Sequence, residues 1–437
     1  MESVFLSISY GGLLYGIWVG NGHFHDYGIG AIFISYVFLI LAVYLFLKKH
    51  SSFLFDPILL LFLLLLFSLF LNILVSPALY LHQSFFAAAY RIFCAILFAG
   101  AFIVYKPHSK FENKRHLMFR GACGAAFLFR VWLIFASPSP VIDVFAQFQE
   151  SAQHILAGLN PYTTLVSDVY QGTRDYGYHM LGYAYPPSNL YLHVLFYFLF
   201  KDIRFGYVLM ELIAAFSLYK IIPTPQKKFA ELITLLFLYN PRGLFVLEQA
   251  WSEPFILGFF ALFVYLFIRN QKSSWLPVLY GYLVSLKQYL VFFIFSYLIL
   301  EKRKSRIFTM LGIIILTTLP FWLWDAHSFL KYGLLFQFKT PFREDGLTLV
   351  SVFYRWFGWT AGKGLAVVLG FAINIFWLWR FKKESVSNYL YLSTLTLFSM
   401  FLMGSQAFCN YYYLVGNLLL FILAIRLREL NLVESQA

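Results

Sequence analysis

Long apolar runs recur along the whole chain and constrain its fold more strongly than any other feature. A helix needs roughly 20 mostly apolar residues to cross the hydrocarbon core of a bilayer. Runs of about that length lie near 5–20, 29–47, 53–75, 86–105, 117–136, 205–222, 252–268, 306–324, 364–380, 387–404 and 410–425. Shorter or interrupted runs lie near 188–200, 229–240 and 275–300. The sequence therefore predicts an all-α, polytopic integral membrane protein with about 11–14 transmembrane or re-entrant helices.

The charged residues favour a membrane location and argue against nucleic acid as a partner. Of the 437 residues, 12% are charged, against about 25% in a typical soluble domain. The net charge of +13 does not form one basic patch, because Lys and Arg gather in short loops between the apolar runs. This distribution is typical of cytoplasmic loops, so we expect membrane lipids around the chain and no nucleic acid. The basic loops are 48–49, 106–116, 227–228, 269–272, 301–306, 380–383 and 426–428.

Loop charge also predicts which segments face outward. Loops 21–28 and 76–85 carry no Lys or Arg, and the longest polar stretch, 137–187, carries only Arg174. Because positive loops stay in the cytoplasm, we expect the inner (cytoplasmic) membrane, with these three loops on the outside or periplasmic face. Three regions follow: N-terminal transmembrane helices over 1–136, an outer loop over 137–187, and C-terminal transmembrane helices over 188–437 with outer loops 241–251 and 325–363.

Two apolar stretches do not fit whole spans. The stretch 275–300 lies between two basic loops and is too long for one span but too short for two. Two half-depth helices meeting at Lys287 fit this length, and such broken helices occur where backbone lines a protected cavity. A lysine at the centre of a lipid-facing helix costs roughly 2.5–3.5 kcal/mol, so we expect Lys287 to face a cavity or an anionic partner. In 188–222, charges at 201–204 separate two apolar runs, and the number of crossings stays open.

The outer loop begins with a predicted amphipathic helix over 143–158, which Gly158 and Asn160 terminate. Its polar face, at the spacing i, i+4, i+7, i+11, carries Asp143, Gln147, Glu150 and His154. Its apolar face carries Val144, Phe145, Phe148, Ala152, Ile155 and Leu156. We expect this helix to lie on the outer membrane surface with the apolar face down. The polar face either meets water or binds a substrate, and periodicity alone does not decide between the two.

Other outer segments supply aromatic and charged residues. Tyrosines such as Tyr162 and Tyr185 combine an apolar face with a hydroxyl tip, which suits a sugar, a lipid headgroup or a plain membrane interface. Charged residues at the expected membrane edge are Arg242, Glu248, Glu253, Lys339, Arg343, Glu344 and Asp345. The three cysteines lie in or beside apolar runs without CxxC spacing, so the sequence supports neither a disulfide framework nor a zinc site.

The order of these pieces resembles a known family. The outer loop opens with an acidic residue, continues as an amphipathic helix ending G-x-N-P-Y at 158–162, and returns to the membrane at Y-P-P, 185–187. Together with the blocks YNPRGLFVLEQAWSEP, SLKQYLVF, PFREDGLTL and FCNYYYLV, this order resembles the GT-C glycosyltransferases. Within them it is most similar to the bacterial polyprenyl-phosphate-mannose-dependent mannosyltransferase-like proteins. The resemblance covers roughly 115–420.

The resemblance implies an enzyme that moves a mannose-like hexose from a polyprenyl-phosphate donor to a lipid or glycan acceptor on the extracytoplasmic face. Asp143 matches the first-loop acid of the family and is implied as the general base that deprotonates the acceptor hydroxyl. The leaving phosphate gains charge, which cations stabilise, and the candidates are Arg242, Lys287 and Arg343. Candidate substrate-binding residues are Glu150, His154, Tyr162, Tyr185, Glu253 and Asp345.

The same residues bear on cofactor use and on two competing functions, a transporter and a scaffold. Many family members carry a pair of acids where this chain has only Asp143, so the sequence does not support a divalent metal, and we expect no cofactor. A transporter or flippase for a lipid-linked sugar would also need cations and broken helices, and a scaffold protein would need no chemistry. The transferase is favoured because the polar residues gather in loops of one face, whereas an alternating-access carrier concentrates them near mid-membrane.

Overall fold

The computed structural model describes residues 1–48, 56–171, 182–223, 226–360, 362–381 and 385–434, and every regular element in these ranges is helical. The elements are α1 (Glu2–Val19), α2 (Asp26–Leu47), α3 (Pro57–Leu74), α4 (Ser84–Tyr105), η1 (Glu112–Lys114), α5 (Arg115–Ala136), α6 (Asp143–Leu156), α7 (Pro187–Phe200), α8 (Arg204–Ile221), α9 (Lys227–Leu238), α10 (Gly243–Glu248), α11 (Glu253–Arg269), α12 (Trp275–Val284), η3 (Gln288–Phe292), α13 (Phe293–Leu300), α14 (Lys304–Ser328), η4 (Phe329–Leu334), α15 (Phe336–Lys339), α16 (Leu349–Phe357), α17 (Lys363–Arg380), α18 (Val386–Leu402) and α19 (Cys409–Glu434).

The predicted class, an all-α polytopic membrane protein, agrees with the length and composition of these helices. Within the described residues, six segments are long and apolar enough to cross a membrane: Asp26–Leu47, Pro57–Leu74, Ser84–Tyr105, Glu112–Ala136, Lys304–Leu334 and Cys409–Glu429. Six is fewer than the 11–14 helices predicted. Several other apolar helices are shorter than a full span, such as α12 with 10 residues.

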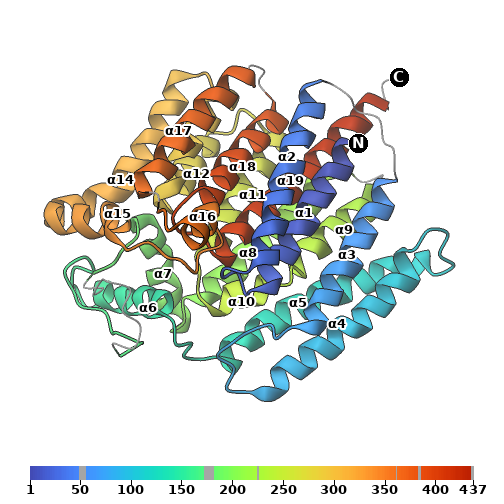
Figure 1. Cartoon of the computed structure of the whole chain (residues 1–437), viewed down its shortest axis with the longest axis horizontal. Helices are drawn as coiled ribbons and strands as arrows, with labels where there is room; N and C mark the ends of the chain where they lie inside the picture. Colours follow the sequence, from blue (N-terminus) through green and yellow to red (C-terminus); the bar gives the residue numbers. More distant parts are fainter. Residues whose placement is uncertain (49–55, 172–181, 224–225, 361, 382–384, 435–437) are drawn as a thin grey trace.

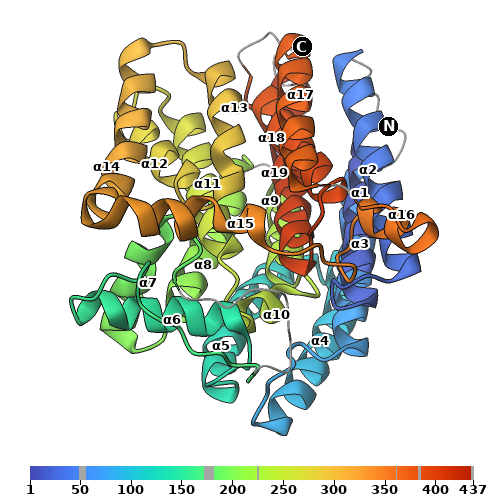
Figure 2. The ribbon, with the colours of Figure 1, turned by 60° about the vertical axis from the view of Figure 1, so that its left-hand side comes forward.

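The chain closes on itself, because α1 packs against α19 as well as against α2 (Figure 1). Helix α8 packs along α11, and α12 packs along α14. Helices α6, α7 and α10 lie at the end of the molecule away from both termini, and α15 crosses above α6 (Figure 2). The predicted outer loops 137–187 and 241–251 therefore meet at one end of the helical bundle.

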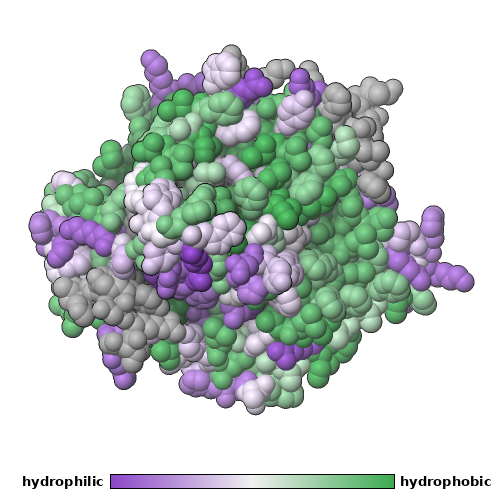
Figure 3. Space-filling view, viewed as in Figure 1, coloured by the Kyte–Doolittle hydropathy of each residue, from purple (hydrophilic) through white to green (hydrophobic). Residues whose placement is uncertain are grey.

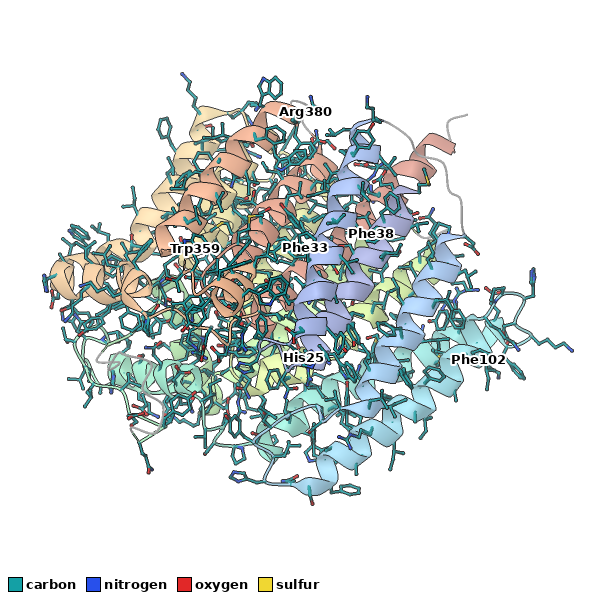
Figure 4. All side chains as sticks on the ribbon, viewed as in Figure 1. His25, Phe33, Phe38, Phe102, Trp359 and Arg380 are labelled. Atoms are coloured by element: carbon teal, nitrogen blue, oxygen red, sulfur yellow. The ribbon has the colours of Figure 1, made fainter. Side chains whose placement is uncertain are left out.

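Much of the face shown in Figure 3 is hydrophobic, as helices that face lipid require. Phe33 of α2 and Phe102 of α4, both labelled in Figure 4, are 46% and 51% exposed. Local sequence sets some helix ends: Asp56 accepts a hydrogen bond from the Ile58 N–H at 2.9 Å, and Pro57 takes the first position of α3. Charged side chains that are buried among the helices need partners, which they find in other elements.

One buried ion pair connects four helices. Arg130 of α5 places its Nε 2.5 Å from the Glu211 Oε2 of α8, and both side chains are at most 2% exposed. Arg130 also donates to the main-chain oxygen of Leu238 at 2.8 Å, at the end of α9. The hydroxyl of Tyr413 in α19 donates to the second oxygen of Glu211 at 2.8 Å. A buried charge is tolerated only when it is paired and hydrogen-bonded, and this cluster meets that condition.

The predicted helix break at Lys287 is confirmed. Helix α12 ends at Val284, η3 begins at Gln288, and Lys287 between them has an extended backbone with φ −145° and ψ 149°. The stretch 188–222 forms two helices, α7 and α8, and Lys201 ends α7 in the left-handed region with φ 61°.

The predicted amphipathic helix 143–158 forms as α6, which ends at Leu156. Gln147 on the polar face is 1% exposed and donates to the main-chain oxygen of Gly182 at 3.1 Å. At Gln147 the polar face therefore meets the segment around Gly182 and not open water. Leu156 on the apolar face is 47% exposed, and α7 packs against the helix. The contact of the apolar face with the membrane surface stays a prediction.

The buried pair leads to a stability prediction. Replacing Arg130 by Met leaves the Glu211 carboxylate buried without its cation, which costs about 3–5 kcal/mol. Glu112→Gln is the control, because its ion pair with Arg115 is 53% exposed at the carboxylate and contributes about 0–1 kcal/mol. The free energies of unfolding are compared in detergent. A loss below about 1 kcal/mol for Arg130→Met would contradict the assignment.

Candidate functional site

A cavity of about 630 Å³ lies among the segments that the sequence predicts to face outward. Three residues that the sequence singled out line it together: Asp143 from the start of α6, Lys287 from the helix break, and Arg343 from the loop after α15. Tyr185 of the returning outer segment lines it as well. The fold therefore gathers the predicted base, two of the three predicted phosphate-binding cations and one predicted substrate-binding tyrosine around one volume.

Asp143 is half-buried and is the first residue of α6. Its Oδ1 accepts from the Val144 N–H at 2.8 Å and from the Tyr170 hydroxyl at 3.4 Å. The positive end of a helix dipole stabilises a carboxylate in this position. These contacts hold the Asp143 carboxylate at the start of α6, where it lines the cavity.

Lys287 is 5% exposed and forms an ion pair with Glu253, with 2.6 Å between Nζ and Oε1. Its ammonium also lies over three tyrosine rings, with 5.7, 5.6 and 5.7 Å to the ring centroids of Tyr185, Tyr289 and Tyr411. We call these three tyrosines the aromatic cage. The expectation from sequence that Lys287 faces a cavity or an anionic partner is confirmed on both counts.

Arg343 forms a bidentate ion pair with Asp345: Nε and Nη2 each lie 2.7 Å from a carboxylate oxygen. His23, from the loop between α1 and α2, lies 3.3 Å from the same carboxylate. Burial raises the pKa of Asp345, but hydrogen bonds from Arg343 and His23 outweigh it and hold this pKa well below its usual range. The Phe24 N–H donates to the Asp345 main-chain oxygen at 2.8 Å. This cluster therefore joins the N-terminal loop to the rim of the cavity.

The returning outer segment, 182–186, is irregular backbone whose carbonyls are satisfied by side chains. Gln288 donates to the Ala184 oxygen at 3.1 Å and to the Gly333 oxygen at 2.8 Å. The Tyr162 hydroxyl donates to the Tyr185 oxygen at 2.8 Å. Buried carbonyls need such donors when no helix supplies them. The hydrogen bonds fix the backbone that carries Tyr185 into the cage.

The cavity lining has two chemical characters. Its apolar part comes from η3, α15, α17 and α18, with Phe292, Leu335, Phe338, Val367, Phe371 and Phe401. Leu335 and Phe338 are 49% and 55% exposed, so the cavity reaches the hydrophobic outer surface at these side chains. Its polar part comes from the outer loops and α6, with Asp143, Gln147, Gln249, Lys287, Arg343 and Gln406. A volume of this kind suits an amphipathic ligand with a polar head and an apolar chain.

The remaining predicted residues lie elsewhere. Arg242 is 1% exposed and outside the cavity lining; its guanidinium donates to the main-chain oxygen of Trp18 at 2.8 Å and to the side chain of Asn21, which anchors the N-terminal loop. Glu150 accepts from the Ser167 N–H at 2.8 Å, away from the lining. These contacts are structural, and no contact in the structure directs either side chain into the cavity.

Four further candidates, His154, Tyr162, Glu253 and Asp345, do not line the cavity. Burial lowers the pKa of His154, while the nearby Glu150 charge raises it. Tyr162 is fully buried and supports Tyr185 through the hydrogen bond already described. Glu253 stands behind Lys287. Asp345 holds Arg343. Tyr162, Glu253 and Asp345 therefore act on the cavity through other residues.

Sequence reasoning missed several lining residues. Gln249 and Trp251 lie within the block YNPRGLFVLEQAWSEP, and Tyr411 lies within FCNYYYLV, so the blocks carried the signal although these residues were not singled out. No sequence signal pointed to His23. It lies in a short loop without a motif, and nothing in the sequence connects that loop to Asp345.

Loss of the Gln288 amide is expected to destabilise the site. Gln288→Leu removes the donor to Gly333, which costs about 1–3 kcal/mol, and leaves the Ala184 oxygen with only the longer bond from Gln337 at 3.3 Å. Gln83→Leu is the control, since the exposed side chain of Gln83 accepts one hydrogen bond, from Trp132, in the described part of the chain. Thermal unfolding and protease cleavage within 163–186 provide the measurements. Equal behaviour of the two variants would exclude a fixing role for Gln288.

No protein-family model, curated protein or solved structure matches this chain. Among the described residues, no group of three or more His, Cys, Asp and Glu side chains could hold a metal ion. The cavity and its lining residues are therefore the basis for a functional assignment.

Proposed function

We propose that this chain is a membrane glycosyltransferase that moves a hexose from a polyprenyl-phosphate donor to a lipid or glycan acceptor on the extracytoplasmic face. One observation carries the proposal: Asp143, Lys287 and Arg343 line a single cavity that also has an apolar lining. A carboxylate, two cations and an apolar surface are the groups that a lipid-phosphate sugar and a hydroxyl acceptor require.

The reaction assigns a step to each group. The acceptor hydroxyl oxygen forms a bond to the anomeric carbon of the sugar while its proton passes to the Asp143 carboxylate. The bond between the anomeric carbon and the phosphate oxygen breaks, and its electron pair stays on the phosphate, which leaves with the lipid. Lys287 and Arg343 stabilise the charge that grows on this phosphate, since ion pairing and hydrogen bonding act where charge develops.

Both cations already have carboxylate partners, and the two pairs differ in how easily a phosphate replaces the partner. The Arg343–Asp345 pair is 16% and 41% exposed, so a phosphate can approach the guanidinium without the desolvation that a fully buried pair imposes. The Lys287–Glu253 pair is buried. An ammonium has three N–H donors, so Lys287 keeps its bond to Glu253 and still has donors for a phosphate oxygen.

The identity of the base is tested by Asp143→Asn. We expect sugar transfer to fall at least about 100-fold, because an amide does not accept the proton of the acceptor. Transfer is measured in membranes supplied with a panel of labelled polyprenyl-phosphate sugars, at equal protein levels. Asp26→Asn is the matched control, because Asp26 is also the first residue of its helix but is exposed and absent from the cavity lining.

Unaltered transfer by Asp143→Asn would remove Asp143 from the reaction. Labelled sugar that crosses vesicles containing the purified chain, without any new glycosidic bond, would instead establish a transporter of lipid-linked sugar.

Arg343→Gln is expected to weaken donor binding. Hydrogen bonds to charged groups contribute about 1.5–3 kcal/mol, so KM for the donor should rise about 10- to 100-fold while kcat changes less. Arg355→Gln is the control, because Arg355 lies over the Phe24 ring near the same loop and does not line the cavity. Equal KM values for the two variants would exclude Arg343 from donor binding.

A further inference from the structure

Glu253 stands directly behind the cavity. It is fully buried, it is the first residue of α11, and it is absent from the cavity lining. Its Oε1 accepts from the Lys287 ammonium at 2.6 Å, from the Asn410 amide at 2.9 Å and from the Tyr289 hydroxyl at 3.2 Å. All three donors belong to residues that line the cavity. The position of one carboxylate oxygen therefore sets the position of three lining side chains.

The second oxygen of Glu253 has no such role. Oε2 is buried and accepts no hydrogen bond from the other described residues. A buried carboxylate with an unsatisfied oxygen is unfavourable, and a buried ion pair is itself weak evidence for stability. Stability alone does not account for this arrangement, so the charge on Glu253 calls for another explanation.

The groups around Lys287 supply that explanation. The charged and titratable side chains that face its ammonium are Glu253 of α11, Tyr289 of η3, Tyr185 of the returning segment and Tyr411 of α19. The faces of the three tyrosines attract a cation but not a neutral amine. Desolvation acts in the opposite direction, because burial disfavours the charged form of a lysine. Glu253 is the only carboxyl group among these side chains, and it contacts the ammonium at 2.6 Å.

We propose that Glu253 is a positioning residue that keeps Lys287 protonated and holds its ammonium at the cavity wall, where it receives the phosphate of the donor. The role of the ammonium rests on the proposed function, whereas the effect of Glu253 on Lys287 is a property of the chain alone. The carboxylate makes no contact with the ligand. It acts through Lys287, and the aromatic cage limits where the ammonium can move.

The pH profile of Lys287 acetylation tests the effect of Glu253. The purified full chain in detergent receives short pulses of acetic anhydride between pH 6.5 and 10.5, and peptide mass spectrometry measures the rate at each lysine. Restricted access lowers the acetylation rate of a given lysine by the same factor at every pH. The pH at the midpoint of its rate profile therefore reports loss of the ammonium proton. In Glu253→Gln we expect this midpoint for Lys287 to fall by at least about one pH unit, a tenfold larger amine fraction.

Two controls define the comparison. Lys201, which is exposed, is the internal standard and should not change in any variant. Glu231→Gln removes a buried carboxylate that pairs with Arg115 instead and should leave the Lys287 profile unchanged. An unchanged Lys287 midpoint in folded Glu253→Gln overturns the proposal. If that variant does not fold, the wild-type profile tests the proposal. A wild-type Lys287 midpoint more than one pH unit below that of Lys201 also overturns the proposal.

A binding measurement connects the charge to the ligand. Geranylgeranyl phosphate is titrated into wild-type, Glu253→Gln and Glu231→Gln protein at one pH unit below and one pH unit above the Lys287 midpoint that acetylation gives for Glu253→Gln. One unit above that midpoint, binding to Glu253→Gln should be about tenfold weaker than wild type at the same pH, since only about a tenth of its Lys287 keeps the proton. One unit below it, binding should recover, whereas a structural defect would weaken it equally at both. Equal weakening therefore counts against the positioning role. If the wild-type chain does not bind this lipid, the proposed function fails, and the acetylation profile still decides the role of Glu253.

Discussion

The ion pair between Lys287 and Glu253 fixes the geometry of the outer end of the molecule. Lys287 lies where the chain between α12 and η3 is not helical, so its backbone is not held by a helix ladder. The pair connects this break to α11, and the bonds from Asn410 and Tyr289 to the same oxygen bring in α19 and η3. A lysine buried without a counterion would cost several kcal/mol, so the break and its counterion have to occur together.

The two cation–carboxylate pairs at the cavity have different physical properties. Lys287 and Glu253 are buried, and separating them would leave both charges without solvent. Arg343 and Asp345 are partly exposed, so water or another anion can reach this pair. The site therefore has one cation, Lys287, in a pair shielded from solvent, and a second cation, Arg343, in a pair that an arriving anion can reach. In the proposed transfer, Lys287 fixes the position of the phosphate and Arg343 responds to its charge.

The sequence predicted the features that depend on local composition. Apolar runs predicted the helical membrane class, the length of 275–300 predicted the break at Lys287, and polar periodicity predicted a helix starting at Asp143. The features it missed depend on contacts between distant segments. Nothing local distinguishes Arg242, which anchors the N-terminal loop, from Arg343, which lines the cavity. The burial of Gln147 depends likewise on Gly182, a partner that periodicity cannot identify.

The proposed site is built from interruptions of helices, and this has a consequence for its glutamines. Each interruption leaves carbonyl groups without a helical donor, and at membrane depth side chains must supply the missing hydrogen bonds. Gln147 and Gln288 do this for Gly182 and Ala184, the segment that carries Tyr185 into the aromatic cage. These amides belong to the site although they transfer no proton, since the place of Lys287 depends on the cage and the cage depends on that backbone. The chemistry attributed to one carboxylate and two cations is therefore inseparable from the hydrogen bonds of irregular chain around them.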